Sequence, residues 1–338
     1  MKRYLSPLSL LFLIFFIANL SVSSQFQIEG GTSNRPLVGV VRSDGTIVPF
    51  AEYRNKIWWN PWPEITEFDP NNGIPSKSLS RHPEPWFSAC VNADCAWYFW
   101  PTSDTRRILS SRKVVQVENH SDKNWALFTD MSNAVPDKNG AHHKNIGLAL
   151  NTDLKLEGMK DIDVASKEAK DALAFIGPTF LSLENEENER ILHVRESKEF
   201  YEKTGFPVSK RKRTKVEITL TKLRRTSSTT DGRHLYYFQM EKEYERPKVL
   251  PDGQCQHISE LSGWLVKEKD GSLNLTNERF WIPDCDNKGG ISVEMSNILR
   301  LDDRNFVITV EHGYDNENYV IYELEDGNLK RLLETFGG

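Results

Sequence analysis

The densest set of side chains able to do chemistry lies in the segment IWWNPWPEITEFDP, residues 57–70. Indole rings stack on flat apolar faces such as those of sugar rings, and neighbouring carboxylates accept hydrogen bonds from hydroxyl groups. The predicted ligand-binding residues, including one tryptophan further along the chain, are Trp58, Trp59, Trp62, Glu64, Glu67 and Trp86. The alternative is that these aromatic side chains pack beneath a proline-rich loop.

A second aromatic run, Trp97 to Trp100, reads as part of a strand. Alternation along a strand sends Trp97 and Phe99 to one face and Tyr98 and Trp100 to the other. At least half of these four side chains are therefore expected in a core.

Catalysis has weaker support than binding. A glycoside-cleaving enzyme needs two carboxylates at a defined separation in space, which spacing along the chain does not give. The chain has no G-x-S-x-G, no H-E-x-x-H and no glycine-rich phosphate loop, and the adjacent His142 and His143 would point to opposite sides of an extended segment. No cofactor and no metal site is predicted, and the catalytic residues of any enzyme stay unassigned.

Residues 1–24 are typical of a secretory signal peptide, with Lys2 and Arg3 before an apolar run and small residues after it. The run is shorter than the roughly 20 residues that span a bilayer, so no membrane anchor is expected. We expect a secreted protein, extracellular or periplasmic.

Removal of the predicted signal peptide takes away Lys2 and Arg3 and moves the formal charge from -5 to -7. Bulk attraction to nucleic acid is therefore not expected, although the basic run 209–215 would allow a local polyanion contact.

The four cysteines predict two disulfides in an oxidising compartment. Short loops favour pairing Cys90 with Cys95 and Cys255 with Cys285, but the connectivity stays open. Two sequons, at Asn119 and Asn274, would mark surface positions in a host that glycosylates secreted proteins.

Alternation of apolar residues predicts strands along most of the chain, which makes 25–338 a single mostly β domain. The expected strands are 37–42, 46–50, 96–100, 113–117, 125–128, 146–150, 191–194, 216–223, 234–240, 263–267, 273–280, 298–301, 306–310, 319–324 and 329–333. A helical insertion within 160–205 is the exception. One amphipathic helix is expected after an N-cap at Asp163, ending at Gly177-Pro178, and a shorter one over 197–203. The acidic run 184–189 is expected to be an exposed loop.

Four Asp-Gly pairs, with glycines at 45, 232, 271 and 327, predict hairpins with type I′ turns. Their spacing is compatible with propeller blades of about 40 to 50 residues. A set of unrelated hairpins in a sandwich or open barrel would show the same sequence pattern. The predicted fold is therefore mainly β, either propeller-like or another multi-hairpin antiparallel fold, with one or two helices near 163–204.

The stretch 298–324, which begins ILRLDDRNFVITVEHGY, resembles a repeat of secreted FG-GAP-type (integrin-like) propellers, where an Asp-rich loop precedes a strand. Asp302-Asp303-Arg304-Asn305 lacks the alternating Asp or Asn and the glycine of a calcium loop, so calcium is not carried over. The resulting interpretation is a secreted binding protein without catalysis, whose partner is an extracellular carbohydrate or protein. The alternatives are a secreted carboxylate-dependent glycoside-active enzyme and a scaffold that binds a protein partner at a rim of Asp-Gly hairpins.

Overall fold

The computed structural model describes residues 35–61, 95–101, 106–119, 122–131, 144–193, 210–226, 229, 231–244, 257–282, 290–313 and 317–336. All of them belong to one compact unit, Arg35–Gly338. The chain is mainly β, with multiple antiparallel sheets and two helices in its described part, as the alternation predicted. The predicted signal peptide, the helix over 197–203 and the two adjacent histidines lie outside the described residues.

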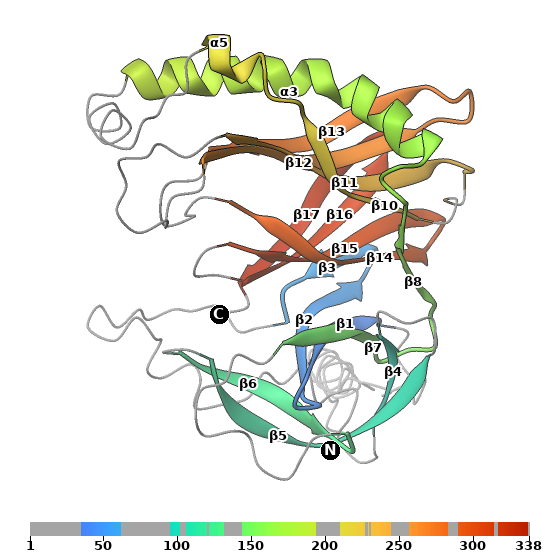
Figure 1. Cartoon of the computed structure of the whole chain (residues 1–338). Coiled ribbons are helices and arrows are strands. Elements are labelled where there is room, and N and C mark those ends of the chain that lie inside the picture. Colours follow the sequence, from blue (N-terminus) through green and yellow to red (C-terminus); the bar gives the residue numbers. More distant parts are fainter. Residues whose placement is uncertain are drawn as a thin grey trace, which may run out of the picture. The chain divides into compact units, whose positions relative to one another are not determined.

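The first sheet closes into a six-stranded barrel (Figure 1). Its strands, in spatial order, are β1 (Leu37–Arg42), β7 (Asn145–Leu150), β4 (Cys95–Pro101), β5 (Arg107–Asn119), β6 (Asp122–Thr129) and β2 (Ile47–Arg54). Pairing of β1 with β2 closes the ring, and the short strand β3 (Ile57–Trp59) extends β2 at an edge. A closed barrel removes exposed strand edges, which limits unwanted pairing with other chains.

Two five-stranded antiparallel sheets follow. The helix-side sheet has the order β13 (Leu273–Trp281), β12 (His257–Lys267), β11 (His234–Tyr244), β10 (Thr219–Arg225) and β9 (Lys160–Asp161). The middle sheet has the order β17 (Asn328–Phe336), β16 (Glu317–Glu325), β15 (Arg304–His312), β14 (Ser292–Leu301) and β8 (Leu156–Gly158). Two helices, α3 (Lys167–His193) and the single turn α5 (Lys210–Arg213), complete the described elements.

The middle sheet is buried on both faces, because its alternating side chains enter two different cores. On β15, Phe306 and Ile308 join barrel residues such as Phe50 in one cluster. Val307 joins Tyr237 and Trp264 of the helix-side sheet in another. A third cluster packs the buried stripe of α3 onto the other face of the helix-side sheet. Figure 1 shows these layers in the order helix, helix-side sheet, middle sheet and barrel.

The second aromatic run follows the predicted alternation. Trp97 and Phe99 are buried in the barrel interior, 0% and 1% exposed. Tyr98 and Trp100 belong to the cluster shared with the middle sheet. The expectation that at least half of these side chains are core is confirmed.

The long helix corrects four predictions. It runs through Gly177-Pro178 to His193, so the acidic run 184–189 is helical, and so are residues 191–193 of the predicted strand. Proline in a helix interior costs about 3 kcal/mol, which burial of the apolar stripe on both sides of Pro178 offsets. Ile176 and Phe180 are both 0% exposed. The cap is Ser166, whose Oγ accepts a hydrogen bond from the Ala169 N–H at 3.1 Å, rather than Asp163.

The Asp-Gly turns form hairpins as predicted, but three of them have a different turn type. Only Asp326-Gly327 places both residues at positive φ, 47° and 74°, as a type I′ turn requires. At Gly45, Gly232 and Gly271 the glycine alone has positive φ, 81°, 82° and 89°. This pattern fits a three-residue loop with a glycine bulge, in which the Asp carboxylate bonds the residue after the glycine. At the Asp270 turn, the Ser272 N–H and Oγ donate at 2.9 and 2.6 Å.

The propeller-like version of the predicted fold is not confirmed. The predicted strands 298–301, 306–310 and 319–324 form successive antiparallel hairpins of the middle sheet. Asp302 and Asp303, which carried the resemblance to FG-GAP repeats, form a two-residue turn with φ values of 51° and 60°. Successive hairpins of this kind occur in many antiparallel folds, so the resemblance stays a prediction.

Candidate functional site

The predicted aromatic segment begins as a hairpin at the edge of the barrel. Strands β2 and β3 are joined by Asn55 and Lys56, both at positive φ, and the strand then alternates its side chains between two faces. Trp58 points inward and is 5% exposed, with its ring 5.4 Å from Phe306 and 5.0 Å from Tyr53 between centroids. Trp58 therefore anchors the hairpin in the core and offers no free face for a ligand.

Trp59 points the other way. It is 42% exposed, and its neighbour on the same face, Ile57, is 55% exposed. The guanidinium carbon of Arg54 lies 4.5 Å from the centre of the Trp59 ring, a cation–π contact that orients the indole. The outward face of the β2–β3 hairpin, formed by Arg54 of β2 and Ile57 and Trp59 of β3, is called the aromatic hairpin below.

The turn of this hairpin is tied to the middle sheet by one arginine. Arg304 Nη1 donates to the Lys56 carbonyl at 2.8 Å, while Nε and Nη2 contact the carboxylate of Glu323 at 2.5 and 2.7 Å. Its hydrogen bond to Glu323 raises the pKa of Arg304, so the guanidinium stays charged. The aromatic hairpin is therefore presented on a fixed support, as a binding surface requires.

The structure does not describe the geometry of most of the other predicted site residues. Trp62, Glu64, Glu67 and Trp86 lie outside the described residues, as do Cys90, Cys255 and Cys285. Cys95 begins β4, where its backbone pairs with Ser111. The disulfide prediction therefore stays a prediction.

A groove lies beside the first turns of α3. This groove, of about 450 Å³, is formed between the first turns of α3 and the helix-side sheet. Its lining residues are Lys167, Glu168, Asp171, Ala172, Arg225, Tyr236, Leu265, Lys267, Gly271 and Leu273. Pockets that hold small ligands usually measure about 300–1,000 Å³.

A hydrogen-bonded triad fixes one wall of the groove. Arg225 Nη1 donates to both oxygens of Glu168 at 2.8 and 3.1 Å, and the Tyr236 hydroxyl donates to Glu168 Oε1 at 2.6 Å. Burial opposes ionisation of Glu168, yet these two donors lower its pKa. Burial and the adjacent carboxylate raise the pKa of Tyr236 to about 12, so the hydroxyl remains a donor. The triad is a rigid, internally neutralised wall.

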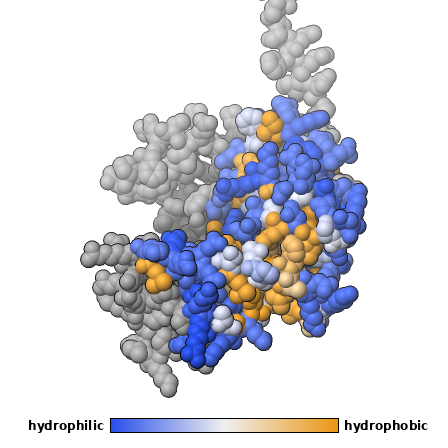
Figure 2. All heavy atoms as spheres, turned by 90° about the horizontal axis from the view of Figure 1, so that it is seen from above, coloured by the Kyte–Doolittle hydropathy of each residue, from blue (hydrophilic) through white to orange (hydrophobic). Residues whose placement is uncertain are grey.

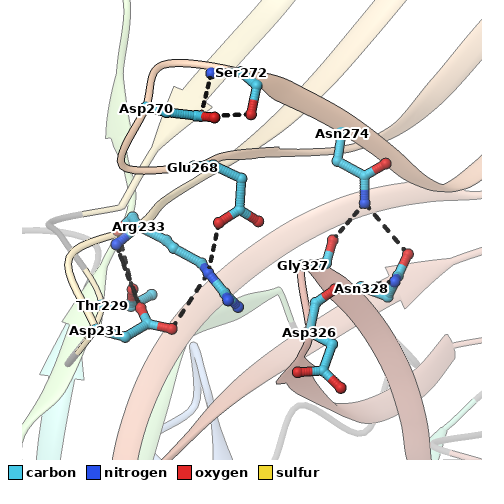
Figure 3. Close-up of polar contacts among 10 residues, drawn as sticks. All are labelled: Thr229, Asp231, Arg233, Glu268, Asp270, Ser272, Asn274, Asp326, Gly327 and Asn328. Atoms are coloured by element: carbon cyan, nitrogen blue, oxygen red, sulfur yellow. Dashed lines mark hydrogen bonds and ion pairs between the residues drawn. The ribbon is translucent and has the colours of Figure 1, made fainter.

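Three of the Asp-Gly hairpins lie close together (Figure 3), and one of them supplies Gly271 to the lining of the groove. We call the turns 229–233, 268–272 and 325–328 the hairpin rim. Arg233 Nε lies 2.8 Å from Glu268 Oε2, which links the first two turns. Asn274 Nδ2 donates to the Gly327 carbonyl at 2.7 Å, which links β13 to the third turn.

The sequon at Asn274 is therefore part of a contact between sheets. Its side-chain amide is the donor to Gly327, and the hydroxyl of Thr276, which is 7% exposed, accepts a hydrogen bond from the Leu329 N–H at 3.3 Å. An attached glycan would need the same amide nitrogen. Asn274 is half-buried in this contact, and whether it carries a glycan stays a prediction.

A second polar cluster joins the barrel to the middle sheet. His312 Nε2 lies 2.8 Å from Glu294 Oε2 and 3.7 Å from Glu317 Oε2. Asn145 on β7 donates from Nδ2 to Glu317 at 2.6 Å. The hydrogen bond to Glu294 raises the pKa of His312 against the effect of burial, and it lowers the pKa of Glu294. This arrangement is an ion-paired contact between two sheets.

Sequence reasoning missed the groove because its residues come from five elements. Lys167 and Gly271 are far apart in the chain, and only the Asp-Gly turn carried a recognisable local signal.

Within the described ranges, no three His, Cys, Asp or Glu side chains gather as metal ligands would. Over the same residues, no helix has the length and apolar character needed to cross a membrane. Comparison with protein-family models, curated proteins and solved structures finds no match to this chain.

Proposed function

We propose that this chain is a secreted, non-catalytic binding protein that recognises an extracellular glycan or similar polymer through the aromatic hairpin. The observation that carries the proposal is the opposed placement of two adjacent tryptophans. Trp58 is locked in the core, while Trp59 is 42% exposed beside the exposed Ile57. An exposed indole on a rigid support supplies a flat apolar face at low cost in side-chain entropy.

The chemistry of the surroundings suits a hydroxylated ligand. Arg54 covers part of one ring face, and its guanidinium carries several N–H groups that can donate to hydroxyl oxygens. The opposite face of the indole is the one on which a sugar ring would stack. In the proposal, the stacking role of the predicted tryptophan set falls to Trp59, with Trp62, Glu64, Glu67 and Trp86 as further candidates.

Affinity electrophoresis in gels containing soluble polysaccharides tests this proposal. Trp59→Ala should weaken retardation by about tenfold or more in apparent Kd, which corresponds to about 1.4 kcal/mol. Ile108→Ala is the matched control, because Ile108 is also an exposed apolar residue of the barrel, 56% exposed. Equal retardation of the Trp59→Ala variant and the wild type in every retarding gel would refute the role of the hairpin.

The hairpin rim favours a second candidate function, a scaffold for a protein partner. Three turns from two sheets are held together by the Arg233–Glu268 ion pair and the Asn274–Gly327 hydrogen bond. A protein partner captured by the wild type and lost on Arg233→Ala, with no polysaccharide retardation, would favour it. The enzyme alternative depends on Glu64 and Glu67, and product formation abolished by Glu64→Gln or Glu67→Gln would establish it.

A further inference from the structure

We infer that the groove at the start of α3 binds a small hydroxylated carboxylate, such as a sugar acid. This inference does not rest on the aromatic hairpin. The groove belongs to α3 and the helix-side sheet, whereas Trp59 belongs to the barrel sheet. The argument uses the charges left over in the groove, its apolar floor and the direction of the helix.

The leftover charges are two cations and one anion. Arg225 and Glu168 neutralise each other within the triad. Lys167, Lys267 and Asp171 line the same groove, and their side chains make no hydrogen bond or ion pair with another described residue, although the positive charge of Lys267 contributes to lowering the pKa of Glu168. The groove therefore carries an excess of one positive charge in a chain whose formal net charge is -5.

The start of α3 adds to the positive potential. The first backbone N–H groups of a helix lack partners inside the helix, and the helix dipole favours negative charge there. Ser166 satisfies the Ala169 N–H, and Lys167 and Glu168 form the first turn. A carboxylate placed between Lys167 and Lys267 would lie at this end of the helix.

The carboxylate of Asp171 and the apolar residues at the base of the groove indicate which kind of anion would bind. A simple inorganic anion could pair with Lys167 and Lys267, but its negative charge would be repelled by the carboxylate of Asp171. A ligand that carries hydroxyl groups beside its carboxylate can donate to Asp171 instead. Ala172 and Leu265 form a floor that is 5% and 0% exposed, which suits the carbon skeleton of such a ligand.

The mouth of the groove is open at the hairpin rim. A side-chain carbon built at Gly271 would meet no other atom within 4 Å. A volume of about 450 Å³ accommodates one or two sugar rings. The site can therefore take a free sugar acid or the acidic unit of a longer chain that leaves across Gly271.

Isothermal titration calorimetry with glucuronate, glucose and inorganic phosphate tests the inference. Glucuronate should bind, and glucose and phosphate should bind at least tenfold more weakly. Lys167→Met and Lys267→Met should each weaken glucuronate binding about tenfold, and Asp171→Asn should weaken it severalfold. Lys170→Met is the matched control, because Lys170 is on the same helix and does not line the groove; it should bind as the wild type does.

Three results would overturn the inference. They are glucuronate binding no tighter than glucose, phosphate binding as tightly as glucuronate, and lysine variants that bind like the wild type. Far-UV circular dichroism of each variant confirms that it is folded. Trp59→Ala should leave glucuronate binding unchanged, so that failure of the groove and failure of the aromatic hairpin are separate outcomes.

Discussion

A buried ion pair beneath α3 gives the most quantitative prediction. Lys242 on β11 and Glu184 on α3 are each 1% exposed, and Nζ lies 2.9 Å from Oε2. Lys242 also donates to the Arg213 carbonyl at 3.1 Å, and the Tyr244 hydroxyl donates to Glu184. Arg213 Nε, at 4.0 Å from Glu184 Oε2, is a second and more distant cation. Removing the closer partner of a buried pair leaves a desolvated charge without its hydrogen-bonded counter-charge, which costs about 3–5 kcal/mol.

Lys242→Met should therefore lower the free energy of unfolding by about 3–5 kcal/mol. Lys155→Met is the matched control, because Lys155 pairs with Glu157 at 3.0 Å but its side chain is 75% exposed. Exposed pairs contribute about 0–1 kcal/mol. The expected difference between the two variants is thus about 3 kcal/mol.

Urea unfolding followed by far-UV circular dichroism measures both variants under the same conditions. The double variant Glu184→Gln/Lys242→Met removes the carboxylate together with its closest cation and should be more stable than Lys242→Met alone, because no buried carboxylate is left without its hydrogen-bonded cation. Arg213 keeps its hydrogen bond to Asn185 Oδ1 at 2.8 Å in that variant. The reasoning is refuted if Lys242→Met costs no more than Lys155→Met. It is refuted equally if removing Glu184 as well makes the protein still less stable.

Three further predictions concern single contacts. His312 has a raised pKa, so its contribution to stability is present below its ordinary value of 6.5 and is lost as the pH rises through the folded value. The stability gap between the wild type and His312→Gln should therefore shrink from pH 6 to pH 9 in urea unfolding; a constant gap would contradict the ion pair. Asn274→Ala should cost about 1–2 kcal/mol in thermal or urea unfolding, because the Gly327 carbonyl loses its donor, and an unchanged stability would show that the rim contact is dispensable. Gly271→Ala should cost about 1 kcal/mol, because φ is 89° and nothing crowds the added carbon, while Gly271→Asn should cost less; equal costs would point away from backbone strain.

The strands could be predicted because their alternation is local. Leu37–Arg42 has the predicted bounds, and 319–324 lies within β16. The pairing of these strands into a closed barrel and two sheets could not be predicted, because hydrogen-bonded neighbours such as β6 and β2 are distant in sequence. The stacking of helix, two sheets and barrel follows from that pairing rather than from the pattern of any one strand.

The long helix was misread because its buried stripe changes from apolar to polar. After Phe180 the inward positions are Glu184 and Asn188, which resemble a solvated acidic run when only the sequence is considered. Burial of Glu184 depends on Lys242, contributed by a strand some sixty residues away in the chain, and Asn188 donates to the Glu184 carbonyl at 2.6 Å. Pro178 strengthened the misreading, since proline usually ends a helix.

The candidate site was predicted only in part. The sequence located the tryptophans, but it did not show that Trp58 would face the core and Trp59 would face outward, since both have the same composition around them. The groove and the hairpin rim require residues from several elements of two sheets. No local pattern could have brought Glu168 to Arg225 or Asn274 to Gly327.

Acrylamide quenching of tryptophan fluorescence tests the central claim most directly. The difference between the wild type and Trp59→Phe isolates the emission of Trp59 from that of buried indoles such as Trp58 and Trp97. The measurement is repeated with hexaoses of glucose, N-acetylglucosamine and galacturonate. The account predicts that this difference signal is readily quenched and that at least one hexaose protects it. A difference signal that resists quenching, or that no hexaose protects while one of them binds, would contradict the role of the aromatic hairpin.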